Sequence, residues 1–361
     1  MIRVLHFYAR MNTGGAETFI MNVYRNIDNN KYQFDFLCSS DKAGFYDDEI
    51  KKLGGNIYYY KISRNPIITI NRIRKAIKSH GPYDAVHSPM MFFSSLICIA
   101  AKMSGIKKII VHSHSAGDIK KNSLKRKFYI SMSRKIINRL ATSKLACGND
   151  AADYLFGKNS NAVICHNGID YSRFSKDYSQ QINKYKTSHG IKNEVIIGEV
   201  ASFLPVKNHE YYIGFAKRLL ENNVNFKIIL VGEGELKTTF LNRIRDEGLS
   251  NVFIVEKATN EIPFFMNLFD IYMMPSLYEG FPLSVIEAAS CGDICLLSNN
   301  ISKEARQLGS NIYYFDINSF PDADKIRKKR PKNNSKIQVE LKKNGFLIEE
   351  TVKLLLEEYN K

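Results

Sequence analysis

The sequence lacks tryptophan and is poor in proline and cysteine, with nine prolines and six cysteines among 361 residues. The cysteines stand at positions 38, 98, 147, 165, 291 and 295, mostly inside apolar runs and without the paired spacing of a disulfide framework. No secretory signal pattern precedes them. We therefore expect a protein of the reducing cytoplasm, with free thiols rather than disulfide bonds.

Long hydrophobic runs and metal-ligand spacings are also missing. The longest apolar run, Met90 to Met103, carries two serines and is shorter than the roughly 20 residues needed to cross a bilayer. Cys291 and Cys295 have no histidine near them, and no two histidines have the His-x-x-x-His spacing of a helical zinc site. We expect neither a membrane-spanning segment nor a bound metal ion.

Acidic residues are scarce relative to basic ones. The chain has 52 Lys and Arg against 36 Asp and Glu, which gives a formal net charge of +16. Between Lys102 and Arg139, eleven residues are basic and only Asp118 is acidic. Such an excess attracts an anionic surface or polymer. Because no nucleic-acid module and no repeated base-stacking pattern accompany it, we expect no nucleic-acid partner.

A basic amphipathic helix is predicted over residues 123–140, within this segment. Its apolar side chains recur every four residues among Lys and Arg. The apolar positions are Leu124, Phe128, Met132, Ile136 and Leu140. Such a helix can lie on an anionic membrane surface, or it can turn its apolar stripe toward the protein's own core. The sequence leaves both alternatives open.

Strand-like and helix-like segments alternate along the chain, which predicts parallel sheets covered by helices on both faces. Strands are predicted at 2–8, 34–38, 57–60, 84–87, 109–112 and 144–147, and again at 195–200, 226–231, 252–255, 271–274, 294–297 and 312–315. We expect an α/β protein with two doubly wound, Rossmann-like domains, 1–167 and 168–348, joined at His166–Asp170. Because ligands bind beyond the carboxyl ends of such strands, the domains are expected to face a shared cleft.

The most informative motif is Glu279-Gly-Phe-Pro-Leu-Ser-Val-Ile-Glu287. Two carboxylates stand eight positions apart, and Pro282 between them suits the first position of a helix. Free N–H groups and the positive end of the helix dipole attract a phosphate at such a helix start. We interpret the motif as a nucleotide-sugar site, with a sugar hydroxyl at Glu279 and a ribose at Glu287.

Weaker motifs stand at the ends of other predicted strands. The glycine turns Gly14-Gly15 and Gly232-Glu-Gly234 allow a phosphate to approach the backbone, although neither has the GxGxxG or Walker pattern. Lys207 follows a strand of the second domain and can act as a point-charge partner of a phosphate. His114 follows the strand at 109–112 and can bond a sugar hydroxyl.

Together these motifs resemble those of family 4 retaining glycosyltransferases of the two-domain GT-B type, over essentially the whole chain. The chain is most similar to enzymes that build bacterial capsular or exopolysaccharide repeat units. The resemblance implies a metal-independent hexosyltransferase without cofactor, whose donor is a nucleotide diphosphate sugar, with UDP as the expected nucleotide. The implied acceptor is a lipid-linked glycan at the cytoplasmic face of the cell membrane. It also implies that a C-terminal helix, about 349–361, packs back on the N-terminal, acceptor-side domain.

The resemblance assigns roles to individual residues. Glu287 binds the ribose, whereas Glu279 holds the donor sugar and favours charge at its anomeric carbon. Lys207 and backbone N–H groups stabilise the leaving diphosphate, and His114 touches the donor sugar or the acceptor side. The implied backbone groups belong to Gly15 and to the segment Gly280, Phe281, Pro282 and Leu283, in which Pro282 has no N–H group. The predicted donor site also includes Gly14, Ser202, Gly232 and Gly234.

One position departs from the family pattern. Where the family usually has Gly-Arg before the lysine, this chain has Ala201-Ser202, so a bidentate phosphate fork is replaced by a hydroxyl. Two alternatives to sugar transfer therefore stay open: a nucleotide-sugar epimerase of the same fold, and a catalytically silent, membrane-bound scaffold. We favour a transferase because Glu279, Lys207 and Glu287 are all present.

Overall fold

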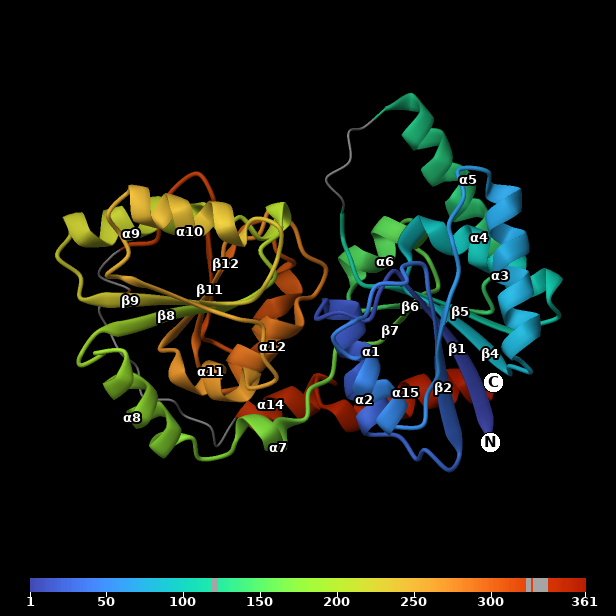
Figure 1. The fold of residues 1–361 in the computed structure, drawn as a ribbon, viewed down its shortest axis with the longest axis horizontal. Coiled ribbons are helices and arrows are strands. Elements are labelled where there is room, and N and C mark those ends of the chain that lie inside the picture. Colours follow the sequence, from blue (N-terminus) through green and yellow to red (C-terminus); the bar gives the residue numbers. More distant parts are fainter. Residues whose placement is uncertain (118–122, 323–325, 327–336) are drawn as a thin grey trace. The chain divides into compact units, whose positions relative to one another are not determined.

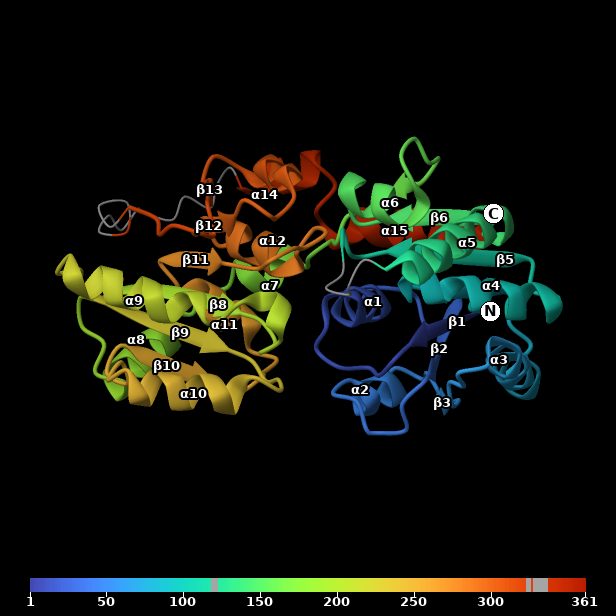
Figure 2. The same cartoon turned by 90° about the horizontal axis from the view of Figure 1, so that it is seen from above.

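The computed structural model describes residues 1–117, 123–322, 326 and 337–361. They form two compact units, which share the architecture of a sheet with helices on both faces (Figures 1 and 2). Unit 1 comprises Met1–Gly168 and Ile348–Lys361, and unit 2 comprises Ile169–Leu347. The division thus falls inside the predicted junction, between Gly168 and Ile169.

Unit 1 is built on a parallel sheet of seven strands in the order β3-β2-β1-β4-β5-β6-β7. The strands are β1 (Ile2–Tyr8), β2 (Tyr32–Cys38), β3 (Ile57–Tyr59), β4 (Ala85–Ser88), β5 (Lys108–Ser113), β6 (Ser143–Ala146) and β7 (Val163–Ile164). The chain reverses its direction of travel across the sheet between β1 and β4. The carboxyl ends of these two strands therefore form the topological switch point, where ligands of open sheets bind.

The helices of unit 1 form two groups. Helices α3, α4, α5 and α6 pack one against the next, whereas α1 packs against α15. Their bounds are α1 (Gly15–Arg25), α2 (Asp47–Lys52), α3 (Pro66–His80), the 3-10 helix η1 (Met91–Phe93), α4 (Ser94–Met103), α5 (Leu124–Leu140), α6 (Asn149–Phe156) and α15 (Ile348–Asn360).

Helix α15 joins the core of unit 1 although it is the last element of the chain. Leu355 and Tyr359 are fully buried there. The Tyr359 hydroxyl is 2.6 Å from Nδ1 of His87, and its carbonyl accepts a hydrogen bond from Nζ of Lys108 at 2.7 Å. These contacts tie the C-terminal helix to β4 and β5.

Helix α5 matches the predicted amphipathic helix in extent. Ser123 is its N-cap and accepts a hydrogen bond from the Arg126 N–H at 3.3 Å. Only Ser133 and Ile137 of this helix are buried, while Leu124 and Phe128 are 85% and 67% exposed. Among the described residues, therefore, nothing covers the first half of the apolar stripe, and the alternative that it faces the core is wrong for this half.

Unit 2 contains a six-stranded parallel sheet in the order β10-β9-β8-β11-β12-β13, with its switch point between β8 and β11. The strands are β8 (Val195–Val200), β9 (Phe226–Val231), β10 (Phe253–Glu256), β11 (Ile271–Met274), β12 (Ile294–Ser298) and β13 (Ile312–Phe315). The helices are α7 (Tyr171–Phe174), α8 (Ser179–Ser188), η2 (Pro205–Lys207), α9 (Tyr211–Glu221), α10 (Lys237–Asp246), α11 (Ile262–Leu268), α12 (Leu283–Ser290), η3 (Lys303–Leu308) and α14 (Ile337–Lys343).

The predicted fold class is confirmed, and each predicted strand is present with ends that shift by no more than two residues. The prediction missed β7 because a two-residue strand leaves no periodic pattern. It also missed α8. No residue of α8 is buried, so this helix has no apolar stripe to reveal it.

Candidate active site

Lys207 and Glu279 meet at the carboxyl edge of the unit 2 sheet. Lys207 ends η2, shortly after β8, and Glu279 follows β11, the neighbouring strand. Nζ of Lys207 donates to Oε1 of Glu279 at 2.5 Å, and each side chain is 19% exposed. The two charges thus lie together at the switch point and remain partly accessible to a ligand.

The loops that carry this pair are fastened to each other. The Leu277 N–H donates to the Val206 carbonyl at 2.8 Å, and Nδ2 of Asn208 donates to the Pro275 carbonyl at 3.2 Å. Asn208 has φ 54°, a left-handed conformation that asparagine tolerates better than most residues. The turn after η2 is therefore locked against the loop that leads to Glu279.

A third charged side chain, Glu199, lies behind the pair and was missed by the sequence reasoning. It is fully buried in β8, and its Oε2 is 3.8 Å from Nε2 of His209. Burial raises the pKa of Glu199 to about 8, although the Lys207 ammonium opposes this shift. Glu199 is the one charged residue in the apolar strand Val195–Val200, which is the signal that marks it.

The lysine and the histidine beside Glu199 differ in charge, because one is protonated and the other is neutral. Burial alone would lower the pKa of Lys207, but the carboxylates of Glu279 and Glu199 outweigh it and raise this pKa. Burial, helped by the Lys207 charge, lowers the pKa of His209 to about 3. Near neutral pH the site therefore holds an ammonium group and a neutral imidazole.

We expect Glu199→Gln to raise the melting temperature more at pH 8.5 than at pH 5. The folded-state pKa of Glu199, about 8, lies above its ordinary value of 4.5. The contribution of this carboxyl to stability is thus complete below pH 4.5 and is lost as the pH rises through 8. Glutamine keeps the shape without the ionisable proton. Thermal melts across this range test the expectation, with the exposed Glu235→Gln as control; a pH-independent difference would contradict it.

The start of helix α12 lies between Glu279 and Glu287, as predicted, but Pro282 is not inside the helix. Pro282 is its N-cap, with φ −71° and ψ 125°, and the helix begins at Leu283. The extended ψ leaves the Pro282 carbonyl free to accept the Val285 N–H at 3.2 Å, which closes the first turn. The prediction was wrong by one position.

The neighbours of this helix start are held by packing. The ring of Phe281 is buried and stacks on Phe346, with centroids 5.1 Å apart. The hydroxyl groups of Tyr272 and Ser284 are 2.7 Å apart and join β11 to the first turn of α12. The predicted contribution of Phe281 is consequently limited to its backbone, because its side chain belongs to the core.

Glu287 lies in the second turn of α12 and is 8% exposed. Burial raises the pKa of Glu287 to about 7, while the charge of Arg173 opposes this shift. A carboxyl that titrates near neutrality can both donate and accept hydrogen bonds. It is therefore suited to a pair of neighbouring hydroxyl groups.

The turn Gly232-Glu-Gly234 requires glycine for close backbone packing. A Cβ on Gly232 would lie 2.0 Å from the Ala201 carbonyl oxygen, and one on Gly234 would lie 2.5 Å from that of Phe203. Gly234 also has φ 158°. These glycines hold the turn after β9 against the loop that contains Ser202. This packing does not test the phosphate contact of the two glycines, which stays a prediction.

The other predicted residues, Gly14, Gly15 and His114, belong to unit 1. Gly14 is the N-cap of α1, and a Cβ there would collide with the Glu17 carboxylate at 2.3 Å, whereas Gly15 borders open space. His114 follows β5 with its ring 4.9 Å from Phe19 and 4.0 Å from His112. Burial lowers the pKa of His114 to about 3, against a hydrogen bond with Asn167, so it can offer a hydrogen bond but no positive charge.

His114 ends a row of imidazoles that crosses unit 1 from β1 to β5. The ring centroids of His6 and His87 are 5.1 Å apart, and those of His87 and His112 are 5.4 Å apart. All three are buried. Burial lowers the pKa of His87 to about 3 and those of His6 and His112 well below the usual range. The row is therefore neutral at physiological pH.

We expect the protein to lose stability steeply below pH 6.5. The folded-state pKa values of the row lie below 6.5, so the unfolded chain takes up these protons first. Stability is complete above pH 6.5 and falls toward pH 3, by about 1.4 kcal/mol per pH unit for each histidine. Urea unfolding between pH 8 and 5 measures the slope. His6→Leu should lower this slope by the contribution of one proton. An unchanged slope would contradict the conclusion that His6 is neutral in the folded protein.

The described residues contain neither a cluster of metal ligands nor a membrane-spanning helix. Within residues 1–117, 123–322, 326 and 337–361, no group of three or more His, Cys, Asp and Glu is arranged to hold a metal ion. The same residues include no helix with the length and apolar character needed to span a bilayer.

Two doubly wound, parallel-sheet units are the architecture of the GT-B glycosyltransferases. The family models agree: Glycosyltransferase Family 4 matches residues 13–173, and Glycosyl transferases group 1 matches residues 181–329. EpsF of Bacillus subtilis (strain 168), itself assigned as a glycosyltransferase, is 35% identical over 309 residues, which are 84% of this chain and 80% of EpsF. The chain belongs to this glycosyltransferase family.

Other relatives are more distant. The capsular polysaccharide biosynthesis glycosyltransferase CapH of Staphylococcus aureus is 27% identical over 332 residues, 89% of this chain and 86% of CapH. The UDP-Gal:α-D-GlcNAc-diphosphoundecaprenol α-1,3-galactosyltransferase of Escherichia coli is 25% identical over 315 residues, 82% of this chain and 79% of that enzyme.

Solved structures show the same fold. Anabaena Alr3699/HepE in complex with UDP-glucose has a TM-score of 0.78 at 14% identity and covers 99% of both chains. A glycosyltransferase from Rickettsia africae has a TM-score of 0.72 at 16% identity, over 99% of this chain and 97% of that one. At these identities the likeness concerns the fold alone.

Proposed function

We propose that this chain transfers a sugar from a UDP-linked donor to a lipid-linked glycan, with retention of anomeric configuration and without a metal ion. The observation that carries the proposal is the contact of Lys207 with Glu279 beside the start of α12, with Glu287 in the same helix. The HepE structure with UDP-glucose and the UDP-Gal substrate of the E. coli relative support the choice of donor.

In this proposal the donor exchanges partners with the ion pair. The diphosphate takes the Lys207 ammonium, which has three N–H donors, and so releases the Glu279 carboxylate. Glu279 then holds a sugar hydroxyl and stabilises positive charge at the anomeric carbon. The N–H groups at the start of α12 and its dipole act on the departing diphosphate, and Glu287 binds the ribose. Contacts from Gly14, Gly15 and His114 remain predictions.

The acceptor belongs to bacterial surface polysaccharide synthesis in this proposal. CapH is named for capsular polysaccharide biosynthesis, and the E. coli relative acts on a diphosphoundecaprenol-linked sugar. A lipid-linked acceptor places the enzyme at the cytoplasmic face of the cell membrane, as a peripheral protein. The exposed apolar and basic side chains of α5 fit such a location.

The donor is tested by thermal shift with UDP-, GDP- and ADP-sugars, followed by a transfer assay with a lipid-diphosphate-linked sugar. We expect stabilisation by a UDP-sugar and a glycosylated lipid product whose new bond has the donor's anomeric configuration. Full activity in the presence of a metal chelator is also expected. An inverted product, or a new nucleotide sugar formed without acceptor, would contradict the proposal.

Membrane association has its own test. Neutralising Lys125, Arg126 and Lys127 at the exposed start of α5 should weaken binding to anionic vesicles, and added salt should weaken binding of the unaltered protein. Flotation with vesicles at two ionic strengths measures both effects. If neither salt nor these substitutions changed vesicle binding, the start of α5 would not be the membrane-binding surface.

A further inference from the structure

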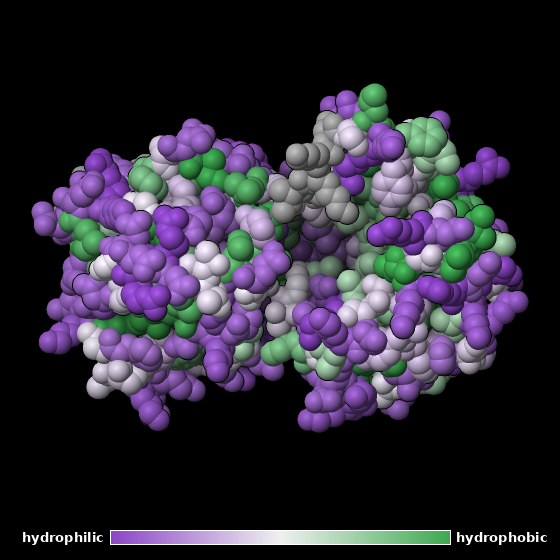
Figure 3. Space-filling view, turned by 45° about the horizontal axis from the view of Figure 1, so that its top comes forward, coloured by the Kyte–Doolittle hydropathy of each residue, from purple (hydrophilic) through white to green (hydrophobic). Residues whose placement is uncertain are grey.

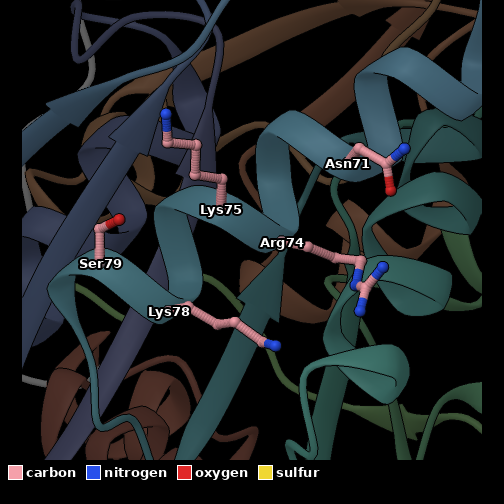
Figure 4. A pocket seen from close by; sticks show the side chains of 5 residues that line it. All are labelled: Asn71, Arg74, Lys75, Lys78 and Ser79. Atoms are coloured by element: carbon pink, nitrogen blue, oxygen red, sulfur yellow. The ribbon is translucent and has the colours of Figure 1, made fainter.

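The charged group that most needs an explanation lies inside unit 2 rather than on the surface. Hydrophilic residues, in purple, cover much of the face shown in Figure 3. The pocket on α3 does not gather its charges around one ligand, because Lys75 and Lys78 point to different sides of the helix (Figure 4). A charged side chain that faces water is ordinary, whereas a fully buried one is unusual. Glu199 in β8 is fully buried.

Glu199 lacks the hydrogen bonds that other buried acids have. Nη2 of Arg3 donates to Oδ2 of Asp35 at 2.5 Å. The Ser143 hydroxyl donates to Oε2 of Glu358 at 2.7 Å. Neither carboxyl oxygen of Glu199 has a partner with hydrogen-bond geometry within the described ranges. Because an ionised carboxylate without hydrogen bonds is costly to bury, this environment favours a proton on Glu199.

The polar groups beside Glu199 do not supply the missing hydrogen bonds. The Tyr212 hydroxyl lies near Glu199 but donates its single proton to the Met273 carbonyl at 2.6 Å. Toward Glu199 it can therefore only accept, which requires a proton on the carboxyl. Nε2 of His209 is 3.8 Å from Oε2 of Glu199, beyond hydrogen-bond distance. The geometry thus agrees with the pKa of Glu199, which burial raises to about 8.

The charge of Glu199 matters because of its neighbour Lys207. The Lys207 ammonium donates to Glu279 at 2.5 Å and lies close enough to Glu199 for each charge to affect the pKa of the other. An ionised Glu199 would be a second carboxylate attracting this ammonium, and it would repel the negative charges of a diphosphate. A protonated Glu199 does neither. One proton behind the ion pair thus controls how strongly Lys207 acts on an anionic ligand.

We propose that Glu199 is a positioning residue, which in its protonated form leaves Lys207 free to bind the diphosphate of the donor. Glu199 acts through Lys207 and does not touch the donor. Where Glu199 is ionised, donor binding takes up a proton from the solvent, because the diphosphate and this carboxylate compete for one ammonium group. The inference rests on the proposed function, in which a UDP-linked donor takes Lys207 from Glu279.

The ionisable groups that face Glu199 come from η2, α9, β11 and the segments that follow η2 and β11. They are Lys207, His209, Tyr212, Tyr272 and Glu279. Burial would lower the pKa of Lys207, but the carboxylates raise it, so Lys207 keeps its charge. His209 stays neutral, and burial raises the pKa of both tyrosines well above the usual value. Between pH 6.5 and 8.5 the titration in this cluster is therefore that of Glu199.

Calorimetry of UDP-glucose binding at pH 6.5 and 8.5, without acceptor, tests the proposal. Between these pH values Kd should rise about fourfold more in the unaltered protein than in Glu199→Gln, as a pKa near 8 requires. At pH 6.5 the two proteins should bind equally, because glutamine resembles the protonated acid. Glu199→Met, a second neutral variant, should behave like Glu199→Gln, whereas the control Glu247→Gln should keep the full pH dependence. Glu287, whose pKa burial raises to about 7, titrates in all four proteins, so its contribution cancels.

Two results would overturn the proposal and leave the proposed function intact. An equal pH dependence in all four proteins would mean that Glu199 does not control Lys207. Markedly weaker binding by Glu199→Gln at pH 6.5 would mean that the carboxyl group itself, rather than the absence of its charge, is required. A third result, no binding of UDP-glucose to the unaltered protein at either pH, would refute the proposed donor and this inference together.

Discussion

Replacing Glu279 by glutamine or Lys207 by alanine is expected to lower kcat roughly 10²- to 10³-fold, the usual loss when one preorganised electrostatic group is removed. Glutamine retains the shape of Glu279 but cannot stabilise positive charge at the anomeric carbon. Alanine at position 207 leaves the diphosphate without the ammonium group that Glu279 now holds at 2.5 Å. Initial rates of UDP release and of product formation measure both effects.

A matched ion pair in the same unit provides the control for these variants. Nζ of Lys217 is 2.6 Å from Oε2 of Glu247, and neither residue belongs to the switch point of the sheet. Lys217→Ala and Glu247→Gln should leave turnover unchanged and alter stability by less than about 1 kcal/mol, because exposed ion pairs contribute little. Unchanged turnover in the Lys207 or Glu279 variant, with the protein folded, would refute the site.

Tyr359→Ala is expected to destabilise unit 1 by about 3–5 kcal/mol, the cost of removing a large buried aromatic side chain. Tyr359 is fully buried, and its ring lies 5.7 Å from Phe34 and 5.9 Å from His87. Tyr359→Phe keeps the packing and loses only the 2.6 Å hydrogen bond to His87, so we expect a loss of about 1 kcal/mol. Deletion of the whole of α15 should unfold unit 1.

Chemical denaturation followed by circular dichroism measures these losses. Lys353→Ala, an exposed position of the same helix, is the control and should leave stability within about 0.5 kcal/mol. If Tyr359→Ala were as stable as this control, α15 would not be part of the unit 1 core. If Tyr359→Phe were as damaging as Tyr359→Ala, the hydrogen bond rather than the packing would dominate.

Much of this fold can be predicted from the sequence because its signals are local. Apolar runs such as Ile2–Tyr8 and Ile271–Met274 are buried on both faces of a parallel sheet and stand out from the polar helices around them. The turn between Glu279 and Glu287 marks the start of α12 for a similar reason, since its glycine and proline suit a loop and a helix start. Even so, local preference placed Pro282 one position too far into the helix.

Other features depend on contacts between distant residues, which local patterns do not contain. Glu279 meets Lys207 because β8 and β11 are neighbours in the sheet, although more than 70 residues separate the two side chains in the sequence. The row from His6 to His112 exists because β1, β4 and β5 lie side by side. His6 and His87, each isolated in the sequence, are therefore neighbours in the fold, where burial keeps them neutral.

The sequence by itself determined the alternation of elements, the two sheets, the positive charge between Lys102 and Arg139 and the motif of the predicted donor site, because each depends on composition or on short-range spacing. The tertiary structure decided which charges meet and which stay exposed. It pairs Lys207 with Glu279, buries Glu199 behind them and leaves Leu124 and Phe128 on the surface. The physical reason is that burial and ion pairing depend on strand order and helix packing, which join residues far apart in the chain.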